Sequence, residues 1–134
     1  MRQIKWLAVT IPVLFFFGAF LGSAAYAATE APFTPQAFSA AQHSGKPILI
    51  DITADWCPVC AKQRPILSEL AKDPAFGDLV ILKVDFDAQK NVVREMGAQM
   101  QSTLIAFHGD HETGRSVGDT DAGSIRALLL KANQ

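Results

Sequence analysis

The chain has 134 residues, of which 12 are basic and 13 acidic, so its formal net charge is only −1. No basic stripe is present, which excludes the electrostatic footprint of a nucleic-acid-binding protein. The sequence has no internal repeat or low-complexity segment, and the part after residue 27 is long enough for one domain with its own core.

The first 27 residues are typical of a secretory signal peptide. Arg2 and Lys5 form a short positive segment, residues 6–21 carry no charge, and Ala25-Tyr26-Ala27 has the small-x-small pattern of a cleavage site. The apolar stretch is shorter than the ~20 residues of a typical spanning helix. We expect cleavage after Ala27, with an uncleaved N-terminal anchor as the alternative. In both cases residues 28–134 form a domain outside the cytoplasm.

Residues 28–53 are predicted to contain a helix and a buried strand. Residues 28–33 are expected to be a loose leader. Thr34-Pro35 provides an N-cap and a first helical residue, and Gly45 ends the helix that follows. Residues 47–53, "PILIDIT", are apolar apart from Asp51, which is typical of a buried central strand.

Helix and strand patterns alternate along the rest of the chain. They predict a helix over 59–73, a strand over 79–87, a short helix over 88–97, strands over 103–107 and 115–118, and a closing helix over 121–133. The first two strands should be parallel with a right-handed crossover, and the last two form a hairpin. This order predicts an α/β fold with a mixed four-stranded sheet and helices on both faces.

The two cysteines, Cys57 and Cys60, stand two residues apart in "DWCPVC". A disulfide across so short a loop removes little freedom from the unfolded chain, so the pair is a poor structural staple. Cys57 follows a buried strand and begins a helix, where unpaired N–H groups favour a thiolate. Cys60 lies one turn deeper on the same face. We therefore expect an exposed Cys57 that attacks a substrate disulfide and a Cys60 that resolves the mixed disulfide.

Together these motifs resemble the thioredoxin family over most of residues 34–131. The block "LIDITADWCPVC" is similar to the family's strand followed by WCxxC, Pro65 matches the proline within its active-site helix, and Thr103-Leu104 matches its turn beside the cysteines. The resemblance implies a thioredoxin-like fold and a thiol-disulfide oxidoreductase that needs no cofactor. It would use a Cys57–Cys60 redox disulfide on protein thiols and disulfides.

The resemblance also implies roles around the pair. Asp51 occupies the position of the family's buried acid and would serve proton transfer at Cys60, because burial raises the pKa of a carboxyl group toward a useful range. Lys83 would neighbour it. A satisfied polar core residue and a plain surface lysine are the respective alternatives. The positions that would contact substrate are Trp56, Pro58, Gln101, Ser102 and Thr103, with ordinary packing as the alternative for Trp56.

Within the family, "SGKPILIDITADWCPVC" is similar to the periplasmic C-terminal domain of membrane thiol reductases that import electrons. It is also similar to small exported proteins that keep periplasmic cysteines reduced, including those that serve cytochrome c maturation. This implies a periplasmic monomer with a membrane thiol reductase as electron donor. Pro58 and Val59 carry neither charge nor histidine, unlike strongly oxidising members, so a reductase is favoured over a disulfide oxidant or isomerase.

The sequence departs from the family at Ser102, where the family has a cis-proline. Because a cis bond before a non-proline costs about 3–4 kcal/mol, we expect a trans or a strained cis peptide between Gln101 and Ser102. The backbone at Gln101, which pairs with an extended substrate in the family, would then be re-aimed. The Ser102 hydroxyl would donate a hydrogen bond to the Cys57 thiolate or leave space for a metal.

Two other functions remain open. The pairs Cys57/Cys60 and His108/His111 have the spacing of zinc ligands. The predicted strand over 103–107, however, would place the histidines roughly 17 Å from the cysteines. We therefore expect the histidines to be turn residues that face solvent, and we expect no metal. A metal or cluster bridged between two molecules is the alternative. The third class, a redox-inert binding or chaperone module, is disfavoured by the cysteine pair and Asp51.

Overall fold

The computed structural model describes residues 27–134, so the predicted signal peptide lies outside the described residues except for Ala27. Within residues 27–134, none of the helices combines the length and the apolar character that a membrane crossing requires.

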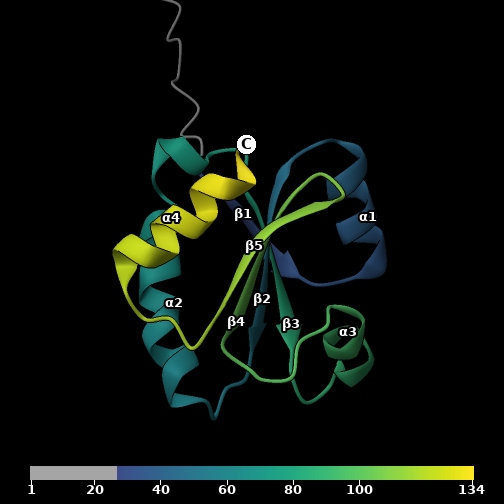
Figure 1. Cartoon of the computed structure of the whole chain (residues 1–134), viewed down its shortest axis with the longest axis vertical. Coiled ribbons are helices and arrows are strands. Elements are labelled where there is room, and N and C mark those ends of the chain that lie inside the picture. Colours follow the sequence, from purple (N-terminus) through teal and green to yellow (C-terminus); the bar gives the residue numbers. More distant parts are fainter. Residues whose placement is uncertain (1–26) are drawn as a thin grey trace, which may run out of the picture.

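A five-stranded mixed sheet forms the centre of the domain (Figure 1). Its strands lie in the order β1-β3-β2-β4-β5, with β1, β2 and β3 parallel and with β4 and β5 antiparallel to their neighbours. The strands are β1 (Thr29–Pro32), β2 (Pro47–Thr53), β3 (Val80–Asp85), β4 (Thr103–His108) and β5 (His111–Val117). The helices are α1 (Pro35–His43), α2 (Pro58–Leu70), α3 (Lys90–Glu95) and α4 (Ala122–Ala132), with a short 3-10 turn at Pro74–Phe76.

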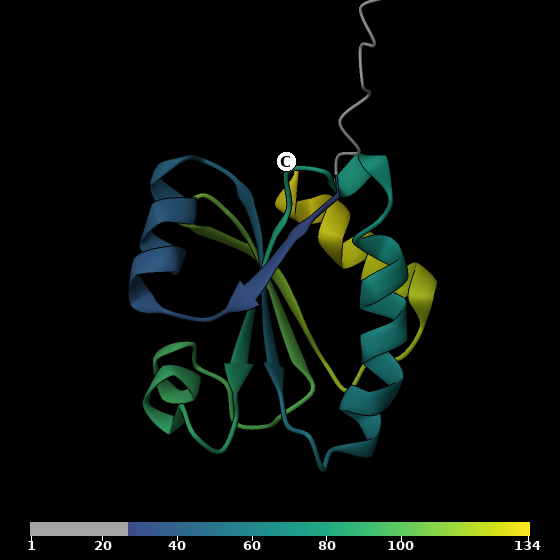
Figure 2. The same cartoon turned by 180° about the vertical axis from the view of Figure 1, so that it is seen from behind.

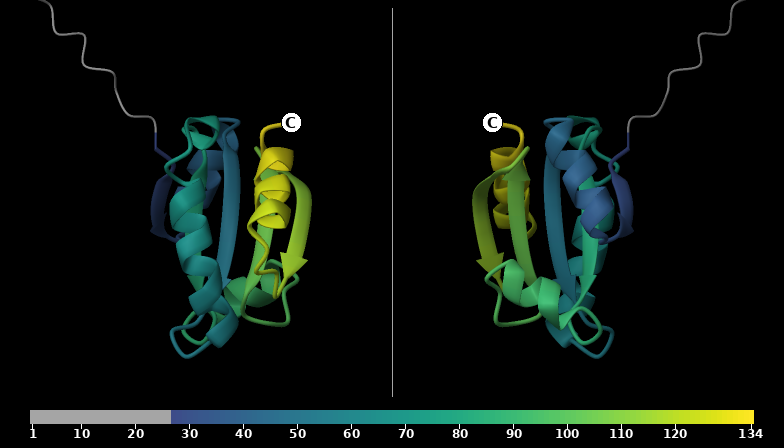
Figure 3. Two further views of the ribbon diagram at one scale, coloured as in Figure 1. Left: turned by 90° about the vertical axis from the view of Figure 1, so that its left-hand side faces the viewer. Right: turned by 90° about the vertical axis from the view of Figure 1, so that its right-hand side faces the viewer.

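Helices cover both faces of this sheet, as predicted. Figure 1 shows α2 and α4 on one side and α1 and α3 on the other, and the reverse and side views in Figures 2 and 3 show the same layers. Alternate residues of β2 face opposite sides of the sheet. Ile50 packs in the core between the sheet and helices α1 and α3, and Leu49 packs in the core between the sheet and helices α2 and α4. Asp51, two residues after Leu49, therefore faces the side of the sheet that α2 covers.

The first strand corrects two expectations. Residues 28–33 were expected to be a loose leader beside a four-stranded sheet, but Thr29–Pro32 forms an edge strand that pairs in parallel with β3. The strand is only four residues long and ends in Pro32, which is tolerated because an edge strand need not donate to a second neighbour. The strand is held mainly by its backbone ladder with β3, so its sequence carries little hydrophobic pattern.

The final hairpin is longer than predicted, because β5 begins at His111 instead of Arg115. A bulge between Ala106 and Phe107 keeps the two strands paired. The functionally important end of the sheet is where β2 and β3 finish and β4 begins, at the bottom of Figure 1. There Ile52 of β2 pairs with Thr103 of β4.

Candidate active site

The cysteine pair lies at the junction of β2 and α2. Cys57 is the N-cap of α2, with extended backbone angles, and Pro58 follows at the start of the helix. The Sγ atom of Cys57 accepts a hydrogen bond from the backbone N–H of Cys60 at 3.0 Å. Cys57 and Cys60 form a disulfide, with their Cα atoms 5.3 Å apart. The first turn of the helix thus directs a backbone N–H group at the sulfur that would carry negative charge after reduction.

Both cysteines are only 1% exposed in this disulfide form. The expectation of an exposed Cys57 is therefore wrong for the oxidised state. The pair packs with Ala54 and against the partly buried side chains of Val59 and Phe86. The two sulfur-bearing side chains are therefore shielded from solvent in the disulfide form.

Trp56, immediately before the pair, is 60% exposed. Its indole N–H donates to the Oδ2 atom of Asp87, 2.7 Å away, at the end of the loop that follows β3. This contact fixes the orientation of a large aromatic face next to the cysteines. Asp87 was missed by the sequence analysis, since its contact spans 31 positions of the chain and no local pattern indicates it.

Asp51 is buried, with 3% of its surface exposed, on the face that α2 covers. Burial raises the pKa of its carboxyl group to about 6; Lys83 lowers this pKa, Glu30 raises it and Arg64 lowers it, in decreasing order of effect. A carboxyl group with this pKa exchanges its proton near neutral pH.

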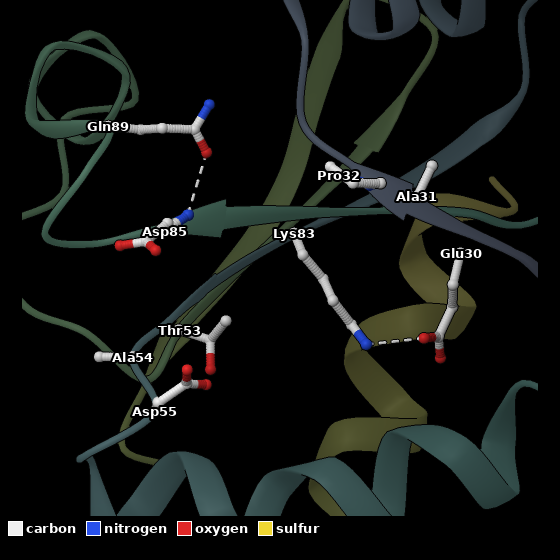
Figure 4. Close-up of a pocket in the computed structure, with 9 residues that line it drawn as sticks. All are labelled: Glu30, Ala31, Pro32, Thr53, Ala54, Asp55, Lys83, Asp85 and Gln89. Atoms are coloured by element: carbon white, nitrogen blue, oxygen red, sulfur yellow. Dashed lines mark hydrogen bonds and ion pairs between the residues drawn. The ribbon is translucent and has the colours of Figure 1, made fainter.

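Lys83 lies opposite Asp51 in the parallel register of β2 and β3. Its ammonium group, however, forms an ion pair with the carboxylate of Glu30 in β1, with 2.7 Å between Nζ and Oε2. Among the described residues no salt bridge joins Lys83 to Asp51, so Lys83 acts on Asp51 only as a neighbouring charge. Figure 4 shows the Lys83 and Glu30 side chains directed toward one another.

These two side chains line a cavity of about 370 Å³ at the carboxyl ends of β2 and β3. The cavity reaches Ala54 and Asp55, just before the cysteine motif (Figure 4). Its lining residues are Glu30, Ala31, Pro32, Thr53, Ala54, Asp55, Lys83, Asp85 and Gln89. A cavity of this size with charged side chains admits water near Lys83, which pairs with Asp51 across β2 and β3. Glu30 belongs to the unpredicted strand β1, so the sequence analysis could not place it here.

The loop before β4 has a trans peptide between Gln101 and Ser102, since residues 27–134 contain no cis bond. Ser102 has a φ of 56°, the one positive φ at a non-glycine residue in this part of the chain. A left-handed conformation costs roughly 1–2 kcal/mol for a residue with a side chain. The Ser102 hydroxyl donates to the carbonyl oxygen of Gln101 at 2.6 Å, so in this state it is not directed at Cys57 as a donor.

Gln63, another residue that sequence reasoning missed, connects this loop to α2. It is 1% exposed, and its Nε2 atom donates to the carbonyl oxygens of Ser102 at 3.3 Å and of Asp119 at 2.8 Å. Thr103, the residue after Ser102, is also buried, and its hydroxyl donates to the carbonyl of Met100. The structure therefore brings Gln101, Ser102 and Thr103 to the same end of the sheet as the cysteine motif.

The histidines lie at the other end of β4. His108 ends the strand that Thr103 begins, and its Nδ1 contacts the carbonyl oxygen of Ala132 at 2.9 Å, so this nitrogen carries the proton. Within residues 27–134 there is no cluster of three or more histidine, cysteine or acidic side chains with the arrangement of a metal site. His108 and His111 are thus separated from the cysteines by the length of the strand.

Comparisons with known proteins agree on one family. A family model described as Thioredoxin matches residues 30–131. The chain is 40% identical over 95 residues to a thioredoxin H-type of Brassica campestris, which covers 71% of this chain and 75% of that protein. It is 36% identical to a thioredoxin of Chlamydia muridarum over 63% of this chain and 80% of the other. Among solved structures, Trxlp of Edwardsiella tarda aligns with a TM-score of 0.74 and 40% identity, over 75% of this chain and 98% of that one.

Proposed function

Because the chain belongs to the thioredoxin family and its Cys57–Cys60 pair makes it a thiol-disulfide oxidoreductase, we propose that it works as a reductase of protein disulfides. The observation that carries the proposal is the disulfide at the start of α2, with only Pro58 and Val59 between the two cysteines in the chain. A pair becomes a strong oxidant when its reduced form is stabilised. Neither of these two side chains offers a charge or a hydrogen-bond donor that would do so.

The reduced pair would act in two steps. The Cys57 thiolate attacks one sulfur of a substrate disulfide, whose S–S bond breaks and whose other sulfur leaves as a thiolate. The Cys60 thiol then loses its proton and attacks Sγ of Cys57, which forms the Cys57–Cys60 disulfide and releases the substrate as a dithiol. Two electrons pass from the pair to the substrate.

Asp51 would take the proton of Cys60 in the second step. Its side chain faces α2 from a buried position, and its pKa of about 6 leaves it mostly ionised, yet close to a proton-accepting range, at neutral pH. Water in the cavity that Lys83 and Glu30 line would carry the proton onward to solvent.

The experiment that tests this activity is the reduction of insulin disulfides with a dithiol as the electron source. Wild-type protein should reduce insulin catalytically. Cys57→Ser should be inactive, because the attacking sulfur is lost. Cys60→Ser should accumulate a mixed disulfide, since the first step proceeds and the second does not. A Cys57→Ser variant as active as wild type would exclude the mechanism.

We further propose that this reductase works outside the cytoplasm, in a bacterial periplasm, as a monomer. The support is the signal-peptide pattern of residues 1–27. A reductase in an oxidising compartment needs a continuous supply of electrons, which a membrane thiol reductase would provide, and the apocytochromes of cytochrome c maturation are one class of thiol client. Cell fractionation with mass analysis of the full chain tests this. Periplasmic protein that begins at Ala28 is expected, and full-length cytoplasmic protein would contradict it.

A further inference from the structure

Gln63 links two loops that border the disulfide. It lies in α2 three residues after Cys60, and therefore on nearly the same face of the helix. Its Nε2 atom donates to the carbonyl of Ser102, just before β4, and to the carbonyl of Asp119, just after β5. One buried amide group thus ties the entry of β4 and the exit of β5 to the helix that carries the cysteines.

The packing of Gln63 does not explain why an amide occupies this position. Its Oε1 atom is buried and has no hydrogen-bond partner among the described residues. An unpaired buried polar atom destabilises a fold, so the Oε1 atom gives no reason for an amide at this position. What only the amide provides is the pair of donors on Nε2.

Those donors hold a loop whose conformation is unfavourable by itself. Ser102 is left-handed, and no proline ring restricts the loop. Its carbonyl oxygen accepts from the backbone N–H of Gly118 at 2.9 Å and from Gln63 at 3.3 Å. Without Gln63, a single backbone hydrogen bond would hold this carbonyl, and the loop could relax to other conformations.

The loop presents an unused backbone donor beside the site. Within residues 27–134 the backbone N–H of Gln101 finds no acceptor, and its neighbour Met100 is 53% exposed. Val117, which lines a pocket together with Met100, and Trp56, directly before the cysteines, are also exposed large side chains, at 55% and 60%. An extended stretch of protein can pair with the Gln101 N–H and cover these side chains. A small disulfide is too short to make either contact.

We propose that Gln63 is a positioning residue for protein substrates, because it holds the loop of residues 100–102 in the conformation that pairs with an extended chain. The inference rests on the proposed function, in which protein disulfides are the substrates. It predicts that Gln63 contributes to the binding of a protein disulfide and contributes nothing to thiol-disulfide exchange itself.

The test compares Gln63→Met with wild type on two substrates, insulin and the small disulfide of thionitrobenzoic acid. Methionine keeps the length of the side chain and removes both donors. The KM for insulin should rise about 5- to 10-fold, which corresponds to the loss of one or two hydrogen bonds, while kcat and the rate with the small disulfide stay within about twofold. Gln63→Asn, which keeps an amide but is too short for both carbonyls, should change in the same direction.

Leu67→Ala is the matched control, since Leu67 is a buried residue of the same helix that belongs to the core away from the loop. It should lower the melting temperature without changing the ratio of the two activities. An unchanged KM for insulin in Gln63→Met, or an equal loss with both substrates, would overturn the inference. Wild-type protein that reduces neither substrate would instead refute the reductase function, so the two failures are distinguishable.

Discussion

Asp51 shows how the chemistry of the site conflicts with stability at a single residue. Burial raises the pKa of its carboxyl group from 3.8 to about 6, and the charges of Lys83, Glu30 and Arg64 modify this effect. The folded state therefore binds the Asp51 proton more tightly than the unfolded state does. Stability falls as the pH rises from about 4 to about 6, and it remains lower above that range.

We predict that Asp51→Asn raises the free energy of unfolding of the oxidised protein by up to about 3 kcal/mol at pH 7, the equivalent of a pKa shift from 3.8 to about 6. The gain should vanish below about pH 3, where the carboxyl group is protonated in both states. Denaturant unfolding at both pH values measures this. Asp110→Asn, the same change at an exposed turn residue, should show no comparable gain. Equal stability of Asp51→Asn and wild type at pH 7 would contradict the account.

A second residue-scale prediction concerns the ion pair of Glu30 and Lys83. Glu30 raises the pKa of Asp51 and Lys83 lowers it, so the two substitutions should act in opposite directions. In Glu30→Gln the pKa of Asp51 should fall toward 3.8, because a negative charge is lost and Lys83 is released. In Lys83→Met it should rise above 6. Titration of the Asp51 carboxyl carbon by NMR measures both, and shifts of the same sign would show that these charges do not act on Asp51 as described.

At the scale of elements, the loop before β4 has a left-handed serine at the position where the family has a cis-proline. Its left-handed residue, Ser102, should prefer the residue type that adopts a positive φ at no cost. We predict that Ser102→Gly is at least as stable as wild type, and that Ser102→Ala, which keeps the Cβ atom and loses the hydroxyl hydrogen bond, is about 1–2 kcal/mol less stable than Ser102→Gly. Denaturant midpoints of the three proteins decide this. An alanine variant as stable as the glycine variant would argue against a left-handed Ser102.

The elements themselves were largely predictable, and the exceptions have physical causes. The N-cap of α1, the buried run of β2 and the glycine after α3 are local signals, so these elements were found within a few residues of their observed bounds. The strand β1 was missed because it pairs with β3 about 50 residues away and has no hydrophobic period of its own. The sheet was therefore predicted with four strands instead of five.

At the scale of the whole molecule, local motifs again revealed some residues of the site, while long-range contacts hid others. Cys57, Cys60 and Asp51 lie within ten residues of one another, so a short motif revealed them. Glu30 and Gln63 contact their partners across 53 and 39 positions of the chain, respectively. Only the fold brings such residues together. Glu30 acts on the pKa of Asp51, and Gln63 holds the loop beside the disulfide.

The direction of electron flow is the central claim about the molecule as a whole. The most direct test is the equilibrium of the full domain with reduced and oxidised glutathione, from which the reduction potential of the Cys57–Cys60 pair follows. A reductase should give a value of about −270 mV, because neither the Pro58 nor the Val59 side chain offers a charge or a hydrogen-bond donor that would stabilise the reduced form. A value near about −120 mV would mean that the pair is an oxidant and would contradict the proposed function.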